Sequence, residues 1–154
     1  MSRRGLVLGY GNPGRGDDGL AIRLVEALEV PAGVDVEAAF QPGIEHAAAV
    51  ADHDWVLFVD AAADARAPFE VRKVEPLPNA AFSTHVVDLG SILVIAAESF
   101  GRRTPAWLLA IRGYDFGLAE ELSAGAVRNL DAALACAREL IGFQQDGGER
   151  NGDT

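Results

Sequence analysis

The sequence predicts an α/β fold, a three-layer α/β/α sandwich around a twisted, mostly parallel sheet of five strands. Two observations predict it. Short apolar runs alternate along the chain with segments whose apolar residues recur every three or four positions. The connections between successive strands are mostly long enough to hold a helix, which is typical of parallel sheets covered on both faces. A length of 154 residues suits one domain, which we expect at residues 1–143.

The strands are predicted from apolar runs and from alternation. Residues 55–59 form a continuous apolar run, typical of a central strand buried on both faces. Residues 34–40 and 69–74 alternate apolar and polar side chains, as half-buried strands do. The short link before residues 69–74 favours an antiparallel strand at an edge of the sheet. The five predicted strands cover residues 6–10, 34–40, 55–59, 69–74 and 107–111.

The helices are predicted from a period of about 3.6 residues. Leu20, Leu24 and Leu28 recur four apart and place one apolar stripe on the first helix. The four predicted helices cover residues 19–28, 45–52, 86–100 and 122–141. Residues 144–154 are polar, charged and rich in glycine, so we expect a disordered tail there.

Composition and charge exclude several classes of function. The formal net charge of −10 opposes binding to nucleic acid and to anionic lipid, so we expect neither as a partner. No apolar run reaches the roughly 18 residues of a membrane span, and the N-terminus lacks the pattern of a secretory signal. Cys136 is the single cysteine and cannot form an internal disulfide. These features predict a cytoplasmic protein.

The glycine-rich loop at residues 9–19 contains the spacing GxGxxG, which can hold a phosphate through backbone N–H groups. A P-loop requires Lys and then Ser or Thr after its second glycine, and this chain has Asp17 and Asp18 there. Two carboxylates would repel a phosphate, and Pro13 removes a backbone donor. A dinucleotide-binding module nevertheless stays open as an alternative, with Glu37 as the acid that would bind a ribose.

Three side chains are candidate metal ligands. Asp18 follows the first strand, Asp60 follows the apolar run at 55–59, and His85 stands just before a helix. Because functional loops leave the carboxyl ends of parallel strands, these side chains can converge at one edge of the sheet. Two carboxylates and one imidazole suit Zn²⁺ or Ni²⁺. Each also has a structural interpretation: Asp17 or Asp18 can cap the first helix, and Asp60 and His85 can cap turns or helices.

The remaining candidate groups are expected to be structural. Cys136 lies in the last helix beside Leu134 and Ala137, so we expect a buried core residue and no reactive thiolate. His46 and His53 flank the short helix at 45–52, and we expect both at the surface.

In its motifs the chain resembles the maturation endopeptidases of nickel-iron hydrogenases, from about residue 6 to residue 141. The strongest block matches that family's first strand, GxGN turn, paired acidic motif and first helix. This block comprises Val7-Leu8-Gly9-Tyr10-Gly11-Asn12, Gly16-Asp17-Asp18-Gly19 and Ile22-Arg23-Leu24-Val25-Glu26-Ala27-Leu28. Further matches are Val59-Asp60-Ala61, Thr84-His85 and Leu122-Ser123.

The resemblance implies both a site and an activity. In such proteins the second acid of the pair, the strand-end aspartate and the histidine bind the metal, which makes Asp18, Asp60 and His85 the implied metal ligands and catalytic residues. The implied activity is removal of a C-terminal extension from the precursor of the hydrogenase large subunit. The implied nickel belongs to the substrate, so no permanent cofactor is expected, and zinc or cadmium is expected to replace nickel in crystals. A monomer is expected.

Two departures from the family pattern bear on the substrate. Residues 41–45 read Gln-Pro-Gly-Ile-Glu, where many members have an Asp-Gly-Gly-Thr loop, and Ala21 replaces a common glycine. The 41–45 loop is similar to a Gln-x-x-x-Glu variant found in members that serve cytoplasmic hydrogenases, and it is a candidate for setting substrate choice. A non-catalytic nickel or hydrogenase-assembly chaperone, which binds the precursor without shortening it, is a second alternative.

Overall fold

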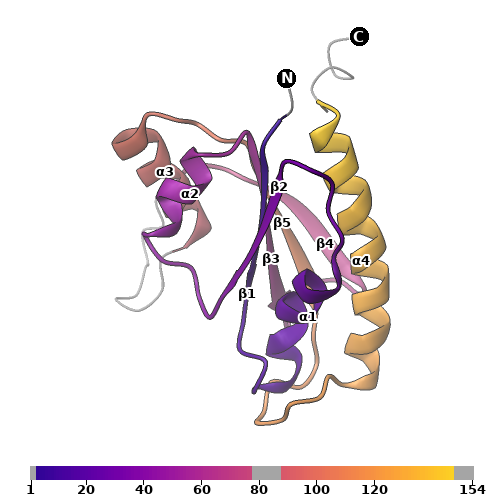
Figure 1. The fold of residues 1–154 in the computed structure, drawn as a ribbon. Coiled ribbons are helices and arrows are strands. Elements are labelled where there is room, and N and C mark those ends of the chain that lie inside the picture. Colours follow the sequence, from indigo (N-terminus) through magenta and orange to yellow (C-terminus); the bar gives the residue numbers. More distant parts are fainter. Residues whose placement is uncertain (1–2, 78–87, 148–154) are drawn as a thin grey trace.

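The computed structural model describes residues 3–77 and 88–147 (Figure 1). Five strands, four α-helices and one short 3-10 helix, η1, follow one another in the order β1 (Gly5–Tyr10), η1 (Gly16–Gly19), α1 (Leu20–Ala27), β2 (Val34–Ala39), α2 (His46–Ala51), β3 (Trp55–Ala62), β4 (Phe69–Val74), α3 (Leu89–Phe100), β5 (Ala106–Arg112) and α4 (Ala124–Gln145).

The strands form one sheet in the order β2-β1-β3-β5-β4. β1 pairs in parallel with β2 and β3, and β3 pairs in parallel with β5. β4 runs antiparallel to β5 at the edge of the sheet. This confirms the predicted five-stranded, mostly parallel sheet and the antiparallel edge strand.

Helices cover both faces of the sheet, which confirms the predicted three layers. α1 and α4 lie on one face, and α2 and α3 lie on the other (Figure 1). Successive side chains of a strand point to opposite faces. Leu57 and Val59 therefore pack with α1 and α4, while Val56 and Phe58 pack with α2 and α3. The continuous apolar run of β3 is thus required by burial on both sides.

Two elements run further than the sequence pattern predicts. β3 continues to Ala62, so Asp60 lies inside the strand and pairs with Ala110 of β5. α4 continues to Gln145, where the expected tail had already begun. The Gln145 side chain accepts a hydrogen bond from the Trp55 indole N–H at 3.0 Å and donates one to the Arg3 carbonyl at 2.6 Å. Gln144 and Gln145 therefore belong to the folded domain, while residues 148–154 of the expected tail lie outside the described residues.

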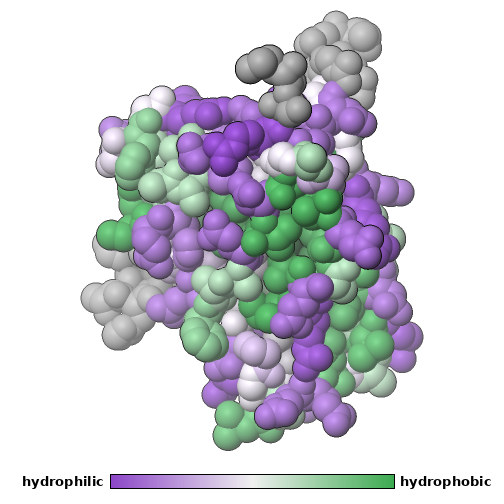
Figure 2. Space-filling model, in the orientation of Figure 1, coloured by the Kyte–Doolittle hydropathy of each residue, from purple (hydrophilic) through white to green (hydrophobic). Residues whose placement is uncertain are grey.

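The surface of the viewed face is uneven in polarity. Figure 2 shows polar side chains over much of this face and apolar surface gathered over its middle, where β2 and α1 lie in Figure 1. Along residues 3–77 and 88–147, no helix combines the length and the apolar character needed to cross a bilayer.

Candidate functional site

The loop after β1 carries the paired acids at the carboxyl edge of the sheet. Asp17 and Asp18 both lie in η1, which leads directly into α1. The expectation that one of them caps α1 is wrong, because Gly19 occupies the N-cap position and no side chain bonds there. The Leu20 N–H instead bonds to the Asp17 carbonyl, so the backbone of η1 satisfies the start of the helix.

Asp17 is fully buried and binds a second segment of the chain. Its carboxylate accepts hydrogen bonds from the backbone N–H groups of Tyr114, Asp115 and Ser123 at 2.7, 3.0 and 2.8 Å, and from the Ser123 hydroxyl at 2.7 Å. Burial raises the pKa of Asp17, but these four donors outweigh it and hold the pKa below its ordinary value. Asp17 therefore fixes η1 to the start of α4 as a charged carboxylate.

Asp18, in η1 after β1, and Asp60, near the end of the neighbouring β3, share the carboxyl edge. Asp18 is half-buried, and its Oδ2 atom accepts a hydrogen bond from the Asn12 N–H at 2.8 Å. Asp60 accepts one from the Ala61 N–H at 2.8 Å. Burial raises the pKa of Asp60 to about 7, the Ala61 N–H opposes that shift, and the Asp18 carboxylate adds to it. The structure thus brings these two predicted site residues together, and their proximity contributes to the raised pKa of Asp60.

His85, the third predicted ligand, lies outside the described residues. Within residues 3–77 and 88–147, no group of three or more His, Cys, Asp or Glu side chains is arranged to hold a metal ion. A divalent cation at Asp18 and Asp60 would therefore need further ligands from elsewhere.

Sequence reasoning missed Tyr10 and His46, which lie beside this edge. The expectation of a surface His46 is wrong, since the residue is only 8% exposed. Its Nδ1 atom accepts a hydrogen bond from the Gly43 N–H at 3.0 Å and lies 3.3 Å from the hydroxyl of the buried Tyr10. Burial raises the pKa of Tyr10 above its ordinary value, and the charges of Asp60, Glu45 and Glu37 raise it further.

His46 therefore links Gly43 of the 41–45 loop to Tyr10, and the Tyr10 hydroxyl lies within reach of the Asp60 charge. The sequence does contain a signal for the contact between His46 and Gly43. His46 stands three residues after Gly43, in the first turn of α2, and that spacing lets the ring fold back over the turn.

His53 has a structural role at the opposite edge, so its expected surface position is also wrong. It is 4% exposed. Its Nε2 atom lies 2.7 Å from an Asp35 carboxylate oxygen, and its Nδ1 atom lies 2.6 Å from the Ala49 carbonyl. The ring joins β2 to α2 near the start of β3, away from Asp60.

Cys136 on α4 packs against the core, as expected, but it is half-buried and not the fully buried residue that the sequence predicts. Burial and then the Glu139 charge raise the pKa of its thiol. A thiol shifted in this direction is a poor nucleophile at neutral pH.

The glycine loop is shaped for packing and leaves few N–H groups for a phosphate. A Cβ atom on Gly9 would lie 2.9 Å from the Val25 side chain, so this glycine lets α1 approach β1. Gly11 has a φ of 149°, where L side chains are strained. The loop N–H groups that bond within the protein are those of Gly11, Asn12, Gly14, Arg15, Gly16, Asp17 and Asp18. These contacts disfavour the dinucleotide alternative.

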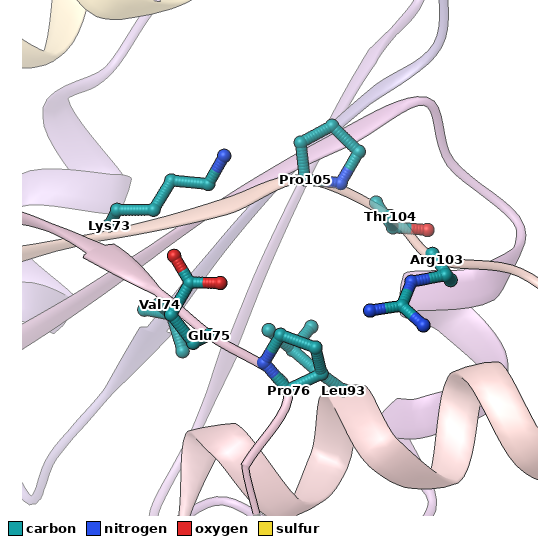
Figure 3. Close-up of a pocket in the computed structure, with 8 residues that line it drawn as sticks. All are labelled: Lys73, Val74, Glu75, Pro76, Leu93, Arg103, Thr104 and Pro105. Atoms are coloured by element: carbon teal, nitrogen blue, oxygen red, sulfur yellow. The ribbon is translucent and has the colours of Figure 1, made fainter.

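A charged cavity lies at the far edge of the sheet. Its volume is about 260 Å³, and it lies between the end of β4 and the segment that leads into β5. Figure 3 shows the side chains that line it, which are Lys73, Val74, Glu75, Pro76, Leu93, Arg103, Thr104 and Pro105. The cavity lies at the start of β5, whereas Asp60 lies toward the carboxyl end of β3. Because β3 and β5 are parallel, the cavity and the acidic pair are at opposite ends of the sheet.

Comparisons with known proteins identify the fold. No family model and no curated protein matches the chain. Among solved structures, the hydrogenase maturating endopeptidase HybD from E. coli is 24% identical with a TM-score of 0.76, and the match covers 94% of each chain. The [NiFe] hydrogenase maturation protease HycI from Thermococcus kodakarensis is 23% identical with a TM-score of 0.71, covering 92% of this chain and 94% of that one.

A third structure agrees with these two. The hydrogenase 2 maturation peptidase from a Thaumarchaeota archaeon is 23% identical with a TM-score of 0.69, covering 92% of this chain and 99% of that one. The alignments span nearly the whole domain in every case. The chain therefore has the α/β/α fold of the hydrogenase maturation endopeptidases.

Proposed function

We propose that this chain is an endopeptidase that removes a C-terminal extension from the nickel-loaded large subunit of a nickel-iron hydrogenase, acting in the cytoplasm as a monomer. The observation that carries the proposal is the pair Asp18 and Asp60. These two carboxyl groups lie at one sheet edge, in a fold shared with solved structures that include a hydrogenase maturating endopeptidase and a [NiFe] hydrogenase maturation protease.

The two carboxyl groups suit a transient contact with a cation. Asp60, with a pKa of about 7, becomes a carboxylate ligand when it loses its proton, and a nearby cation favours that loss. Asp18 is held in place by the Asn12 N–H. We assign His85 as the third ligand. Three ligands from distant segments bind a free ion weakly, and affinity rises when the substrate already holds the ion in place.

In this proposal the nickel is part of the substrate. A divalent cation at the scissile bond can polarise a carbonyl group or lower the pKa of a water molecule. The protein's own contribution is to position the cleaved segment and to complete the coordination through Asp18, Asp60 and His85. The Tyr10–His46 contact supports this role because it ties the 41–45 loop, through Gly43, to a tyrosine within reach of the Asp60 charge.

Cleavage of matched precursors tests the proposal. Purified protein without added metal should shorten nickel-loaded precursor and leave nickel-free precursor intact, with the lost peptide detected by mass spectrometry. Equal cleavage of both forms would mean that the protein acts with an ion of its own. Binding without cleavage of either form would favour the chaperone.

Substitutions test the residues. Asp18→Ala, Asp60→Ala and His85→Ala should each abolish cleavage while the circular dichroism spectrum is unchanged, because all three are assigned to the edge and none to the core. Asp64→Ala is the matched control, since Asp64 is an exposed acid four residues beyond Asp60. Normal cleavage by the Asp18 and Asp60 variants would refute the assignment.

A further inference from the structure

An apolar groove opens beside the loop that carries Asp18. It has a volume of about 260 Å³ and lies between the loop after β1, the first turn of α1 and the carboxyl end of β2. No lining residue is charged or carries a polar side chain. The lining residues are Gly11, Pro13, Ile22, Ala38, Ala39 and Phe40.

The wall of the groove and Asp18 belong to one rigid unit. Gly11 and Pro13 flank Asn12, whose N–H binds the Asp18 carboxylate at 2.8 Å. A Cβ atom on Gly11 would collide with the Asp18 carbonyl, and one on Gly19 would lie 2.9 Å from Pro13. A molecule seated in the groove is therefore held at a fixed distance from Asp18.

Exposed apolar side chains gather around this edge. Nine large apolar side chains are exposed among the described residues, and four of them lie on the loops that follow β2 and β5. These four are Phe40, Ile44, Tyr114 and Leu118. Phe40, the most exposed on its loop at 73%, lines the groove. Apolar surface gathered beside a polar site is typical of a binding surface.

The surroundings of the groove favour an extended peptide as its occupant. β2 is an edge strand, and within the described residues no strand pairs with its outer side. An extended segment can add to such an edge through its backbone while alternate side chains enter pockets. The volume is below the roughly 300–1,000 Å³ of sites for cofactor-sized ligands, and so suits one side chain. Glu37, next to Ala38 in sequence, and Asp18 disfavour an acidic side chain here.

We propose that this groove binds an apolar side chain of the substrate segment that is cleaved, so that Phe40 and Ile22 determine specificity close to the scissile bond. This inference rests on the proposed endopeptidase function and adds to it the class of residue that the enzyme accepts beside the cleaved bond.

Steady-state kinetics with precursor variants test the inference. Phe40→Ala should raise KM about tenfold and leave kcat within about twofold, as expected for loss of part of one buried aromatic contact. Phe100→Ala is the matched control, because Phe100 is also exposed but ends α3. The control should not change either constant. Equal KM values for Phe40→Ala and wild type would overturn the inference.

The precursor supplies the second half of a double-mutant cycle. Each residue near the cleaved bond is replaced by Asp in turn. One apolar position should become a poor substrate for wild type, with a smaller loss for Phe40→Ala, because the two side chains share one contact. Additive losses at every position would overturn the inference while leaving the proposed function in place.

A probe that needs no cleavage separates the two proposals. In an NMR titration, N-acetyl-leucine methylamide should shift the Ile22 methyl signals, and N-acetyl-aspartate methylamide should not. If wild type cleaves no precursor, the proposed function fails, and the probe decides on the groove alone. Equal shifts with both probes, or none with either, would overturn the groove as an apolar peptide site.

Discussion

Replacing Asp17 with alanine should destabilise the protein more than any other single change to its surface loops. The Asp17 carboxylate is fully buried and receives four hydrogen bonds, three of them from backbone N–H groups between residues 114 and 123. Alanine removes the acceptor and leaves those donors without their partner. A buried N–H group without an acceptor has lost its hydrogen bond to water and gained none in return, which destabilises the folded state.

The size of the effect follows from the number and the kind of these bonds. A hydrogen bond to a charged group contributes about 1.5–3 kcal/mol, and such contributions do not add fully. Removing one member of a buried charged network typically costs about 3–5 kcal/mol. For a domain of this size, each kcal/mol corresponds to about 2–4 °C in Tm, so Asp17→Ala should lower Tm by roughly 10 °C.

Thermal unfolding followed by circular dichroism measures this change. Asp115→Ala is the matched control, because the Asp115 side chain is in the same loop region and accepts one exposed hydrogen bond, from the Gly117 N–H at 3.0 Å. The control should cost less than about 1 kcal/mol. If the two variants unfold at the same temperature, the buried carboxylate does not hold the loops together as argued.

The pH dependence of stability gives an independent check. The pKa of Asp17 is held below its ordinary value of 3.8 in the folded protein. The stabilisation is therefore present above pH 3.8 and is lost as the pH falls through the lower folded value. Wild type should lose Tm over this acid range more steeply than Asp17→Ala, which no longer carries the group.

Three further predictions concern the site edge and the cysteine. Because the pKa of Asp60 is about 7, cadmium binding measured by calorimetry should strengthen as pH rises from about 6 to about 8, and Asp60→Asn should bind weakly throughout. His46→Ala removes the acceptor of the Gly43 N–H, so that amide should exchange faster with deuterated water, whereas Tyr10→Phe should leave it protected. Cys136→Ala should cleave precursor at the wild-type rate, and loss of cleavage with an unchanged fold would indicate a thiol mechanism.

The periodicity of apolar residues predicts the architecture of this protein because burial is nearly complete on both faces of the sheet. The run at 55–59 has no polar residue, and each of its side chains packs under a helix. Both ends of β4 are predicted correctly, but the carboxyl ends of β3 and α4 depend on other segments and are missed. α4 reaches Gln145 because its side chain meets Trp55, a contact that no local pattern announces.

The placement of candidate residues is predicted where the order of the strands decides it and missed where partners distant in sequence decide it. Asp18 follows β1 and Asp60 lies toward the carboxyl end of the neighbouring β3, so the order of the sheet is enough to bring them together. Asp17 was expected to be a possible helix cap, but its partners stand 97 to 106 positions away. His46 was expected at the surface, and its contact with Tyr10 spans 36 positions. The role of His85 as a third ligand stays a prediction.

Because α4 is anchored at both ends, its length is constrained. Ser123 at its start bonds to Asp17, and Gln145 at its end bonds to Trp55. With 22 residues the helix spans about 33 Å, at 1.5 Å per residue. One inserted residue would advance everything after it by about 1.5 Å and turn it by about 100°. The two end contacts could then not form together, so sequences that keep this fold should vary freely in the exposed side chains of α4 while keeping the number of residues between its anchors.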